Sequence, residues 1–86
     1  YETMTNMVVE VAGDLCDGRV VAVHEGGYSE AYVPFCGHRV IEQLSGHATA
    51  LEDPFLANFL LQQPDSELIQ WQCSYIDRLA SSLGLI

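Results

Sequence analysis

The chain has 86 residues, with 12 acidic side chains, three arginines and no lysine, and its net charge is −9 at pH 7. A chain of this length holds one domain at most and buries only a modest core. Its charge repels phosphate backbones and anionic lipids, so nucleic acid and membrane surfaces are excluded as expected partners. No apolar run approaches the roughly 20 residues that span a bilayer.

The three cysteines indicate the cellular compartment of the protein. Cys16, Cys36 and Cys73 are odd in number, widely spaced and set in apolar surroundings. This pattern is typical of reduced thiols and not of a disulfide framework or a zinc ribbon. We therefore expect a cytoplasmic protein. The chain begins at Tyr1 without a methionine or a secretory signal pattern, so we expect a chain that has been cut, processed or only partly described.

The first expected element is a helix, followed by a strand. Apolar residues recur with the helical period at Met4, Met7, Val8, Val11, Ala12 and Leu15. Asp17-Gly18 breaks this pattern. The continuous apolar run Val20-Val21-Ala22-Val23 is typical of a strand buried on both faces of a parallel sheet. We expect an α/β fold, mostly helical, with one buried strand at about residues 20–24.

The remaining elements are predicted to be helices. The second begins either at a Ser29 cap or nearer Pro34, and ends at Leu44 before Ser45-Gly46. Asp53-Pro54 predicts a short helix over residues 55–62. The last helix begins at Asp65 or Ser66 and ends at Gly84. Residues 1–46 thus form a helix, strand, glycine loop and helix, and residues 47–86 form a helical tail.

The five residues His24-Glu25-Gly26-Gly27-Tyr28 directly follow the predicted strand. Open α/β sheets keep their ligand sites just beyond the carboxyl ends of the strands. Gly26 and Gly27 permit positive φ and close approach of a ligand, and would aim the Tyr28 phenol across that edge. From the spacing alone, an ordinary tight turn with a half-buried tyrosine is the simpler interpretation.

Residues 20–46, VVAVHEGGYSEAYVPFCGHRVIEQLSG, resemble the end of the catalytic domain in the histone deacetylase superfamily, especially its bacterial class II-like amidohydrolases. In that family a Glu-Gly-Gly-Tyr loop supplies a tyrosine that hydrogen-bonds the acyl oxygen of an acetylated amine beside a catalytic zinc. The resemblance implies that Tyr28 is catalytic and that Gly26 and Gly27 contact the substrate. It also implies a C-terminal fragment of a parallel-sheet arginase/deacetylase-like domain. Beyond Glu52 the resemblance is looser.

The zinc ligands of that family, two aspartates and a histidine, have no counterpart here, and neither has its His-His pair. The sequence contains no Asp-x-His and no His-His. His24, His38 and His47 lack partners at metal-ligand spacing. We therefore expect no metal ligand in this chain, zinc only in the parent enzyme, and no activity from the 86 residues alone.

Two other functions stay open. One is an acetylpolyamine amidohydrolase, whose cationic substrate suits acidic surroundings, and the other is a non-catalytic small acidic assembly module. A lone strand leaves its backbone groups unpaired, so we expect pairing with the rest of the parent chain or with another copy. The expected contacts are residues 20–23 and the apolar stripes of the first and last helices. In the parent, the substrate would be an acetylated amine or peptide.

Overall fold

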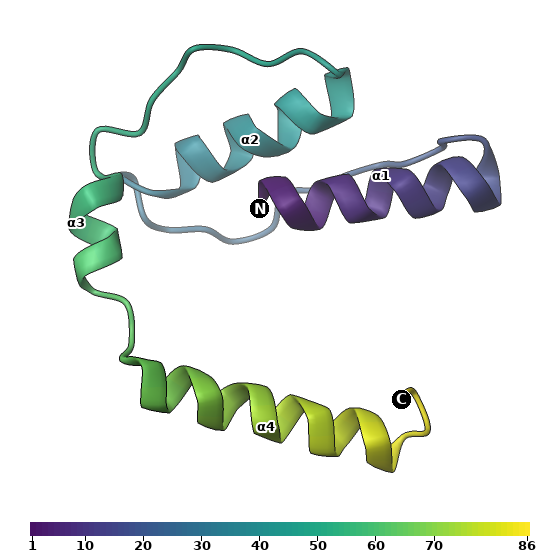
Figure 1. The fold of residues 1–86 in the computed structure, drawn as a ribbon. Helices are drawn as coiled ribbons and strands as arrows, with labels where there is room; N and C mark the ends of the chain where they lie inside the picture. The colour runs from purple at the N-terminus through teal and green to yellow at the C-terminus, as the bar shows by residue number, and fades with distance from the viewer. The chain divides into compact units, whose positions relative to one another are not determined.

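The computed structural model describes all residues 1–86 and contains four helices and no strand. They are α1 (Glu2–Cys16), α2 (Val33–Ser45), α3 (Leu56–Leu61) and α4 (Ser66–Ser82), in chain order (Figure 1). The contacts divide the chain into two units, Tyr1–Phe55 and Leu56–Ile86, which are described separately. No helix combines the length and the apolar character that crossing a membrane would require.

The prediction of a buried strand at residues 20–24, and with it the α/β fold class, is wrong. Residues 19–29 have no regular secondary structure. The side chains of Val21 and Val23 are 89% and 76% exposed. A strand requires the N–H and C=O groups of a neighbouring strand, and no other strand exists in this chain. The apolar run marks residues suited to burial without supplying the sheet that would bury them.

The first unit is built on the contact between α1 and α2. The segment joining them runs back past α1, so both helices point in the same general direction (Figure 1). Ala12 of α1 is the one buried apolar side chain of the chain, at 8% exposed.

The ends of α2 follow from its sequence. The helix begins after Tyr32 with Pro34 in its first turn, where an absent N–H leaves no helical hydrogen bond unmade. Of the two predicted starts, the one near Pro34 is therefore confirmed. Gly46 ends the helix with φ 71°, a left-handed conformation that glycine adopts without strain.

The second unit contains α3 and α4, both at positions that the sequence predicts. Asp65 caps α4, because its Oδ1 accepts a hydrogen bond from the Leu68 N–H at 2.9 Å. At the other end Gly84 has φ 69°, and the Leu85 N–H donates to the Ala80 carbonyl at 2.9 Å. These bonds satisfy backbone groups that a helix end leaves without intrahelical partners.

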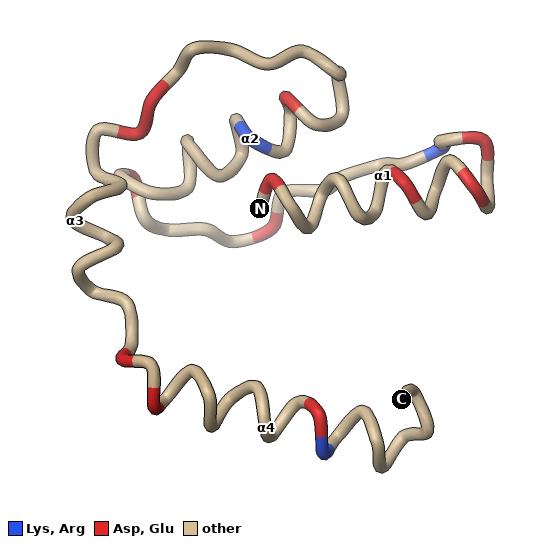
Figure 2. The backbone as a smooth tube through the Cα atoms, viewed as in Figure 1, with Lys and Arg blue, Asp and Glu red and all other residues tan.

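Acidic side chains are spread along the whole chain and are not gathered in one segment (Figure 2). Arg19 pairs with Asp17 at 3.3 Å on the surface, and Arg39 pairs with Glu42 at 2.7 Å. The Arg78 guanidinium lies 5.9 Å from the centre of the Tyr75 ring. Three arginines cannot neutralise 12 carboxylates, so the surface stays strongly negative.

Candidate functional site

The glycine loop, residues Glu25–Tyr28, lies in the irregular segment between α1 and α2. Its backbone turns through two consecutive left-handed residues, Gly26 with φ 68° and Gly27 with φ 81°. Residues with a Cβ adopt this conformation at a cost of about 1–2 kcal/mol. The expected positive φ of both glycines is thus found, independently of the missing strand.

Gly27 also occupies a position where a side chain would fit only if its neighbours moved by a few tenths of an ångström. A Cβ at Gly27 would lie 3.0 Å from His24 Nε2 and 3.1 Å from both methyl groups of Val33. At Gly26 the nearest such contact is Tyr28 Cε2 at 4.0 Å, an ordinary van der Waals distance. The imidazole of His24 and the isopropyl group of Val33, in the first turn of α2, therefore crowd any side chain at Gly27, and we call these two side chains the seat.

The Tyr28 side chain is 96% exposed. Its phenol can approach a partner from outside this chain and donate one hydrogen bond to it. Tyr28 directly follows Gly27, whose left-handed conformation sets the direction in which the backbone continues to the phenol.

A groove of about 430 Å³ lies beside the loop in the first unit. It is lined by Tyr1, residues 22–25, Gly27 and the apolar side of α2 from Val33 to Leu44. Tyr28 is not among the lining residues. The structure thus brings both ends of the His24–Gly27 turn to the groove, and leaves the phenol outside it.

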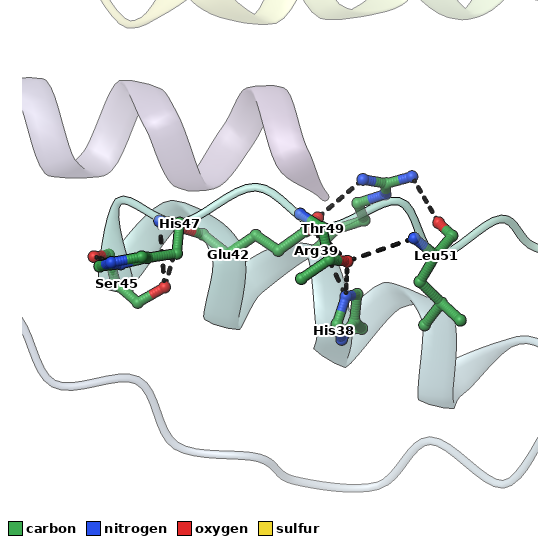
Figure 3. Close-up of polar contacts among 7 residues, drawn as sticks. All are labelled: His38, Arg39, Glu42, Ser45, His47, Thr49 and Leu51. Carbon is green, nitrogen blue, oxygen red and sulfur yellow. Dashed lines mark hydrogen bonds and ion pairs between the residues drawn. The ribbon is translucent and has the colours of Figure 1, made fainter.

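A second polar cluster, which we call the Glu42 cluster, joins α2 to the segment that follows it (Figure 3). Glu42 is 5% exposed, and its carboxylate accepts hydrogen bonds from the Thr49 N–H at 2.6 Å and the Thr49 hydroxyl at 2.7 Å. Arg39 Nη1 donates to the same carboxylate at 2.7 Å, and Arg39 Nη2 donates to the Leu51 carbonyl at 3.2 Å. His38 Nε2 lies 2.8 Å from Thr49 Oγ1.

These contacts hold Glu42 in its charged form. The hydrogen bonds from the Thr49 hydroxyl and N–H, and then the Arg39 guanidinium, lower the pKa of Glu42 to about 2, although burial opposes this shift. Because the single Thr49 hydroxyl proton is donated to Glu42, Thr49 Oγ1 must accept from His38, which places a proton on Nε2 of that imidazole. The cluster therefore fastens residues 49–51 to α2, and both carboxylate oxygens of Glu42 accept hydrogen bonds within it.

The residues of this chain do not fit a zinc site. No group of three His, Cys, Asp or Glu side chains comes together in a way that could hold a metal ion. His38 is engaged by Thr49, and His47 Nδ1 lies 2.8 Å from the Ser45 carbonyl oxygen. His24 Nε2 lies 3.0 Å from the position that a Cβ of Gly27 would take.

The sequence interpretation missed the Glu42 cluster. Arg39 and Glu42 are three residues apart, a spacing that predicts an ion pair on one face of a helix. Nothing in the spacing identifies Thr49, which lies beyond the end of the helix, as the main partner. The burial of an acidic residue on a short helix could be recognised only from the structure.

Comparisons with known proteins cover nearly the whole chain. No family model matches the sequence. The chain is 48% identical over 85 residues to a histone deacetylase-like amidohydrolase of Pseudomonas aeruginosa, covering 99% of this chain and 22% of that protein. It is 36% identical over 74 residues to a probable deacetylase of Archaeoglobus fulgidus, covering 81% of this chain and 21% of that protein. The chain thus spans about a fifth of the length of these curated relatives.

Proposed function

Because the chain is homologous over nearly its whole length to a segment of histone deacetylase-like proteins, we propose that it forms part of a zinc-dependent deacetylase. The enzyme would hydrolyse acetylated amines of the acetyl-lysine type, in the cytoplasm. The observation that carries this proposal is the 48% identity over 85 residues to a protein named as an amidohydrolase. All three cysteines are free thiols, which agrees with a reducing compartment.

The role proposed for this segment is to supply the Tyr28 phenol. Hydrolysis of an amide builds negative charge on the acyl oxygen, and a preorganised hydrogen-bond donor stabilises that charge. Tyr28 is exposed, so its hydroxyl can reach a substrate held by other parts of the enzyme. Gly26 and Gly27 would contact the substrate through a backbone that carries no side chains.

The zinc of this proposal would be held by residues outside the chain, since the 86 residues form no ligand set. The chain alone is accordingly expected to be inactive. A chimera provides the test, and we call it the Pseudomonas chimera: the P. aeruginosa relative in which this chain replaces the matching segment. Failure of the chimera, when folded, to hydrolyse any acetylated amine would contradict the proposal.

In the Pseudomonas chimera, we expect Tyr28→Phe to lower kcat on an acetyl-lysine peptide by about 10²–10³-fold with little change in KM, because one oxyanion donor is lost. Tyr75→Phe removes a phenol hydroxyl from α4 and is the matched control, with an expected change within about twofold. Steady-state kinetics of both variants measure the effect. Equal kcat for Tyr28→Phe and the unchanged chimera would exclude the catalytic role.

Steady-state kinetics of the Pseudomonas chimera also distinguish an acetylated polyamine from an acetyl-lysine peptide as the preferred substrate. The net charge of −9 favours a cationic substrate, as an acetylpolyamine amidohydrolase would use. Comparing kcat/KM for an acetylated polyamine and for an acetyl-lysine peptide decides between the two. A higher value for the polyamine would replace acetyl-lysine as the proposed substrate.

A further inference from the structure

Within this chain, the position of the Tyr28 phenol depends on the backbone on either side of it, because the side chain itself is 96% exposed. The residue before it, Gly27, and the residue after it, Ser29, both belong to the irregular segment that precedes α2. Such a segment places a side chain less precisely than a helix or a strand does. A neighbour that limits the movement of residues 27 and 29 therefore limits the movement of the phenol.

Val33, the first residue of α2, meets the chain on both sides of Tyr28. Both of its methyl carbons lie 3.1 Å from the position that a Cβ of Gly27 would take. Its backbone N–H donates a hydrogen bond to the Ser29 carbonyl at 3.0 Å. One approach is made by the side chain and the other by the main chain, so a substitution at position 33 alters the first and keeps the second.

The side chain of Val33 is suited to limit the movement of the loop. Val33 is half-buried and belongs to a helix that contacts α1. Its branched Cβ restricts rotation about χ1, which keeps the two methyl groups in place. His24, the other member of the seat, is exposed and belongs to the same irregular segment as Gly27, so it can move together with the loop.

We propose that Val33 is a positioning residue for Tyr28, and that its side chain limits the displacement of Gly27 and thereby of the phenol. The inference rests on the proposed function, in which that phenol donates a hydrogen bond to the acyl oxygen of the substrate. In this role Val33 touches no reacting atom and acts only through the loop. An oxyanion donor must lie at hydrogen-bond distance in the transition state, so a small displacement lowers kcat more than it weakens substrate binding.

The test is steady-state kinetics of the Pseudomonas chimera on an acetyl-lysine peptide. Val33→Ala removes both methyl groups and keeps the N–H that is bonded to Ser29. Val40→Ala makes the same truncation about two turns further along α2 and is the matched control. Both valines are half-buried and line the groove of about 430 Å³. Val33→Thr keeps the branched shape and is the conservative variant.

We expect Val33→Ala to lower kcat by about tenfold and to change KM by less than about twofold, because the donor is still present but less well placed. Val40→Ala should change kcat by less than about twofold, and Val33→Thr should keep kcat within about threefold of the unchanged chimera. Equal losses of kcat in Val33→Ala and Val40→Ala would overturn the proposal. So would a loss in Val33→Thr as large as that in Val33→Ala.

Combining two substitutions shows whether Val33 acts through the phenol. In the Tyr28→Phe background, Val33→Ala should change kcat by less than about twofold, because the hydroxyl that it positions is already absent. A tenfold loss in both backgrounds would mean that Val33 affects catalysis by another route, and the proposal would be wrong.

Fluorine NMR gives a readout that needs no turnover. Tyrosines of the chimera are replaced by 3-fluorotyrosine, and the resonance of residue 28 is identified by its absence in Tyr28→Phe. Val33→Ala should shift or broaden this resonance, and Val40→Ala should leave it unchanged. If the resonance responds in this way but the chimera hydrolyses no acetylated amine, the proposed function fails and positioning by Val33 is supported. If Tyr28→Phe loses activity while Val33→Ala alters neither kcat nor the resonance, the proposed function is supported and positioning by Val33 is wrong.

Discussion

Two irregular segments flank α2, and they are held in opposite ways. Residues 46–55, after the helix, are tied down by polar contacts from within the chain, of which those between Glu42 and Thr49 are the shortest. Residues 19–29, before the helix, expose the apolar side chains of Val21 and Val23, and they come near α2 at Gly27, where a Cβ would lie 3.1 Å from the Val33 methyl groups. Residues 46–55 are thus held by hydrogen bonds from within the chain. Residues 19–29 instead expose apolar side chains that another polypeptide surface could bury.

This difference follows from the physics of the two kinds of contact. A buried carboxylate must be satisfied by donors at hydrogen-bond distance, so the partners of Glu42 have to be close at hand. Apolar side chains set no such condition, because any apolar surface can cover them. A segment rich in valine can therefore belong to a core that lies largely outside the chain.

The largest expected loss of stability comes from Gly27→Ala in the Pseudomonas chimera, which alters the segment before α2. A Cβ would strain the backbone at φ 81° and meet His24 and Val33, which together should cost about 2–4 kcal/mol. Gly26→Ala meets the same backbone strain with no close contact, so about 1–2 kcal/mol is expected. Chemical denaturation of both variants measures the difference.

A double variant separates the cost of crowding by Val33 from the cost of backbone strain at Gly27. Adding Val33→Ala to Gly27→Ala removes the two methyl groups 3.1 Å from the new Cβ, and should recover about 1 kcal/mol of the loss. The strain at φ 81° would persist. If Gly26→Ala and Gly27→Ala destabilise the protein equally, His24 and Val33 do not hold the loop.

The seat and the Glu42 cluster are two features that could not be predicted from the sequence. Helix ends are local: Asp65, Pro34 and Gly46 act on backbone groups within four residues of themselves, so the sequence predicted them correctly. The strand at residues 20–24 failed because pairing depends on a partner that the chain does not contain. Hydrophobic pattern reports which residues are suited to burial, and not what buries them.

The same limit applies to the candidate site. The sequence indicated that Gly26 and Gly27 permit positive φ values, and the structure has them, because glycine adopts such values without the strain of a Cβ. The crowding by Val33 that a Cβ at Gly27 would meet was not expected, since it depends on how the loop meets the first turn of α2. Thr49 was missed for a related reason, because its distance from Glu42 is set by the path of the chain beyond Gly46.

A smaller effect, on the attachment of residues 49–51 to α2, is expected when the Glu42 carboxylate is protonated. The folded pKa of Glu42 is about 2, below its ordinary value of 4.5, so its carboxylate stabilises the attachment of residues 49–51 at all pH values above 4.5. This contribution is lost as the pH falls from about 4.5 through about 2. The Thr49 amide chemical shift, followed by NMR, should change with a midpoint near pH 2.

Glu42→Gln is the control for that titration. The amide keeps an oxygen that can accept from Thr49 but carries no charge for Arg39, so the acid transition of the Thr49 amide should disappear. At neutral pH, exchange of the Thr49 amide hydrogen should accelerate by about tenfold, since a charged hydrogen bond has become a neutral one. A transition near the ordinary pKa of 4.5 in the unchanged protein would show that the carboxylate is not held as the structure has it.

The smallest effect is expected from Ser45→Ala, at the same end of α2 but on the surface. The Ser45 hydroxyl donates to the Glu42 carbonyl at 3.2 Å and accepts from the His47 N–H at 3.3 Å. Both bonds are long and the Ser45 side chain is exposed, so water can replace the hydroxyl when it is removed. Exchange of the His47 amide hydrogen should therefore accelerate by only about two- to threefold, with the Thr49 amide unchanged. If Ser45→Ala accelerated exchange at Thr49 as strongly as Glu42→Gln does, the turn at Gly46 would be what holds the segment after α2. The buried carboxylate of Glu42 would then not be the reason that residues 46–55 are held within the chain.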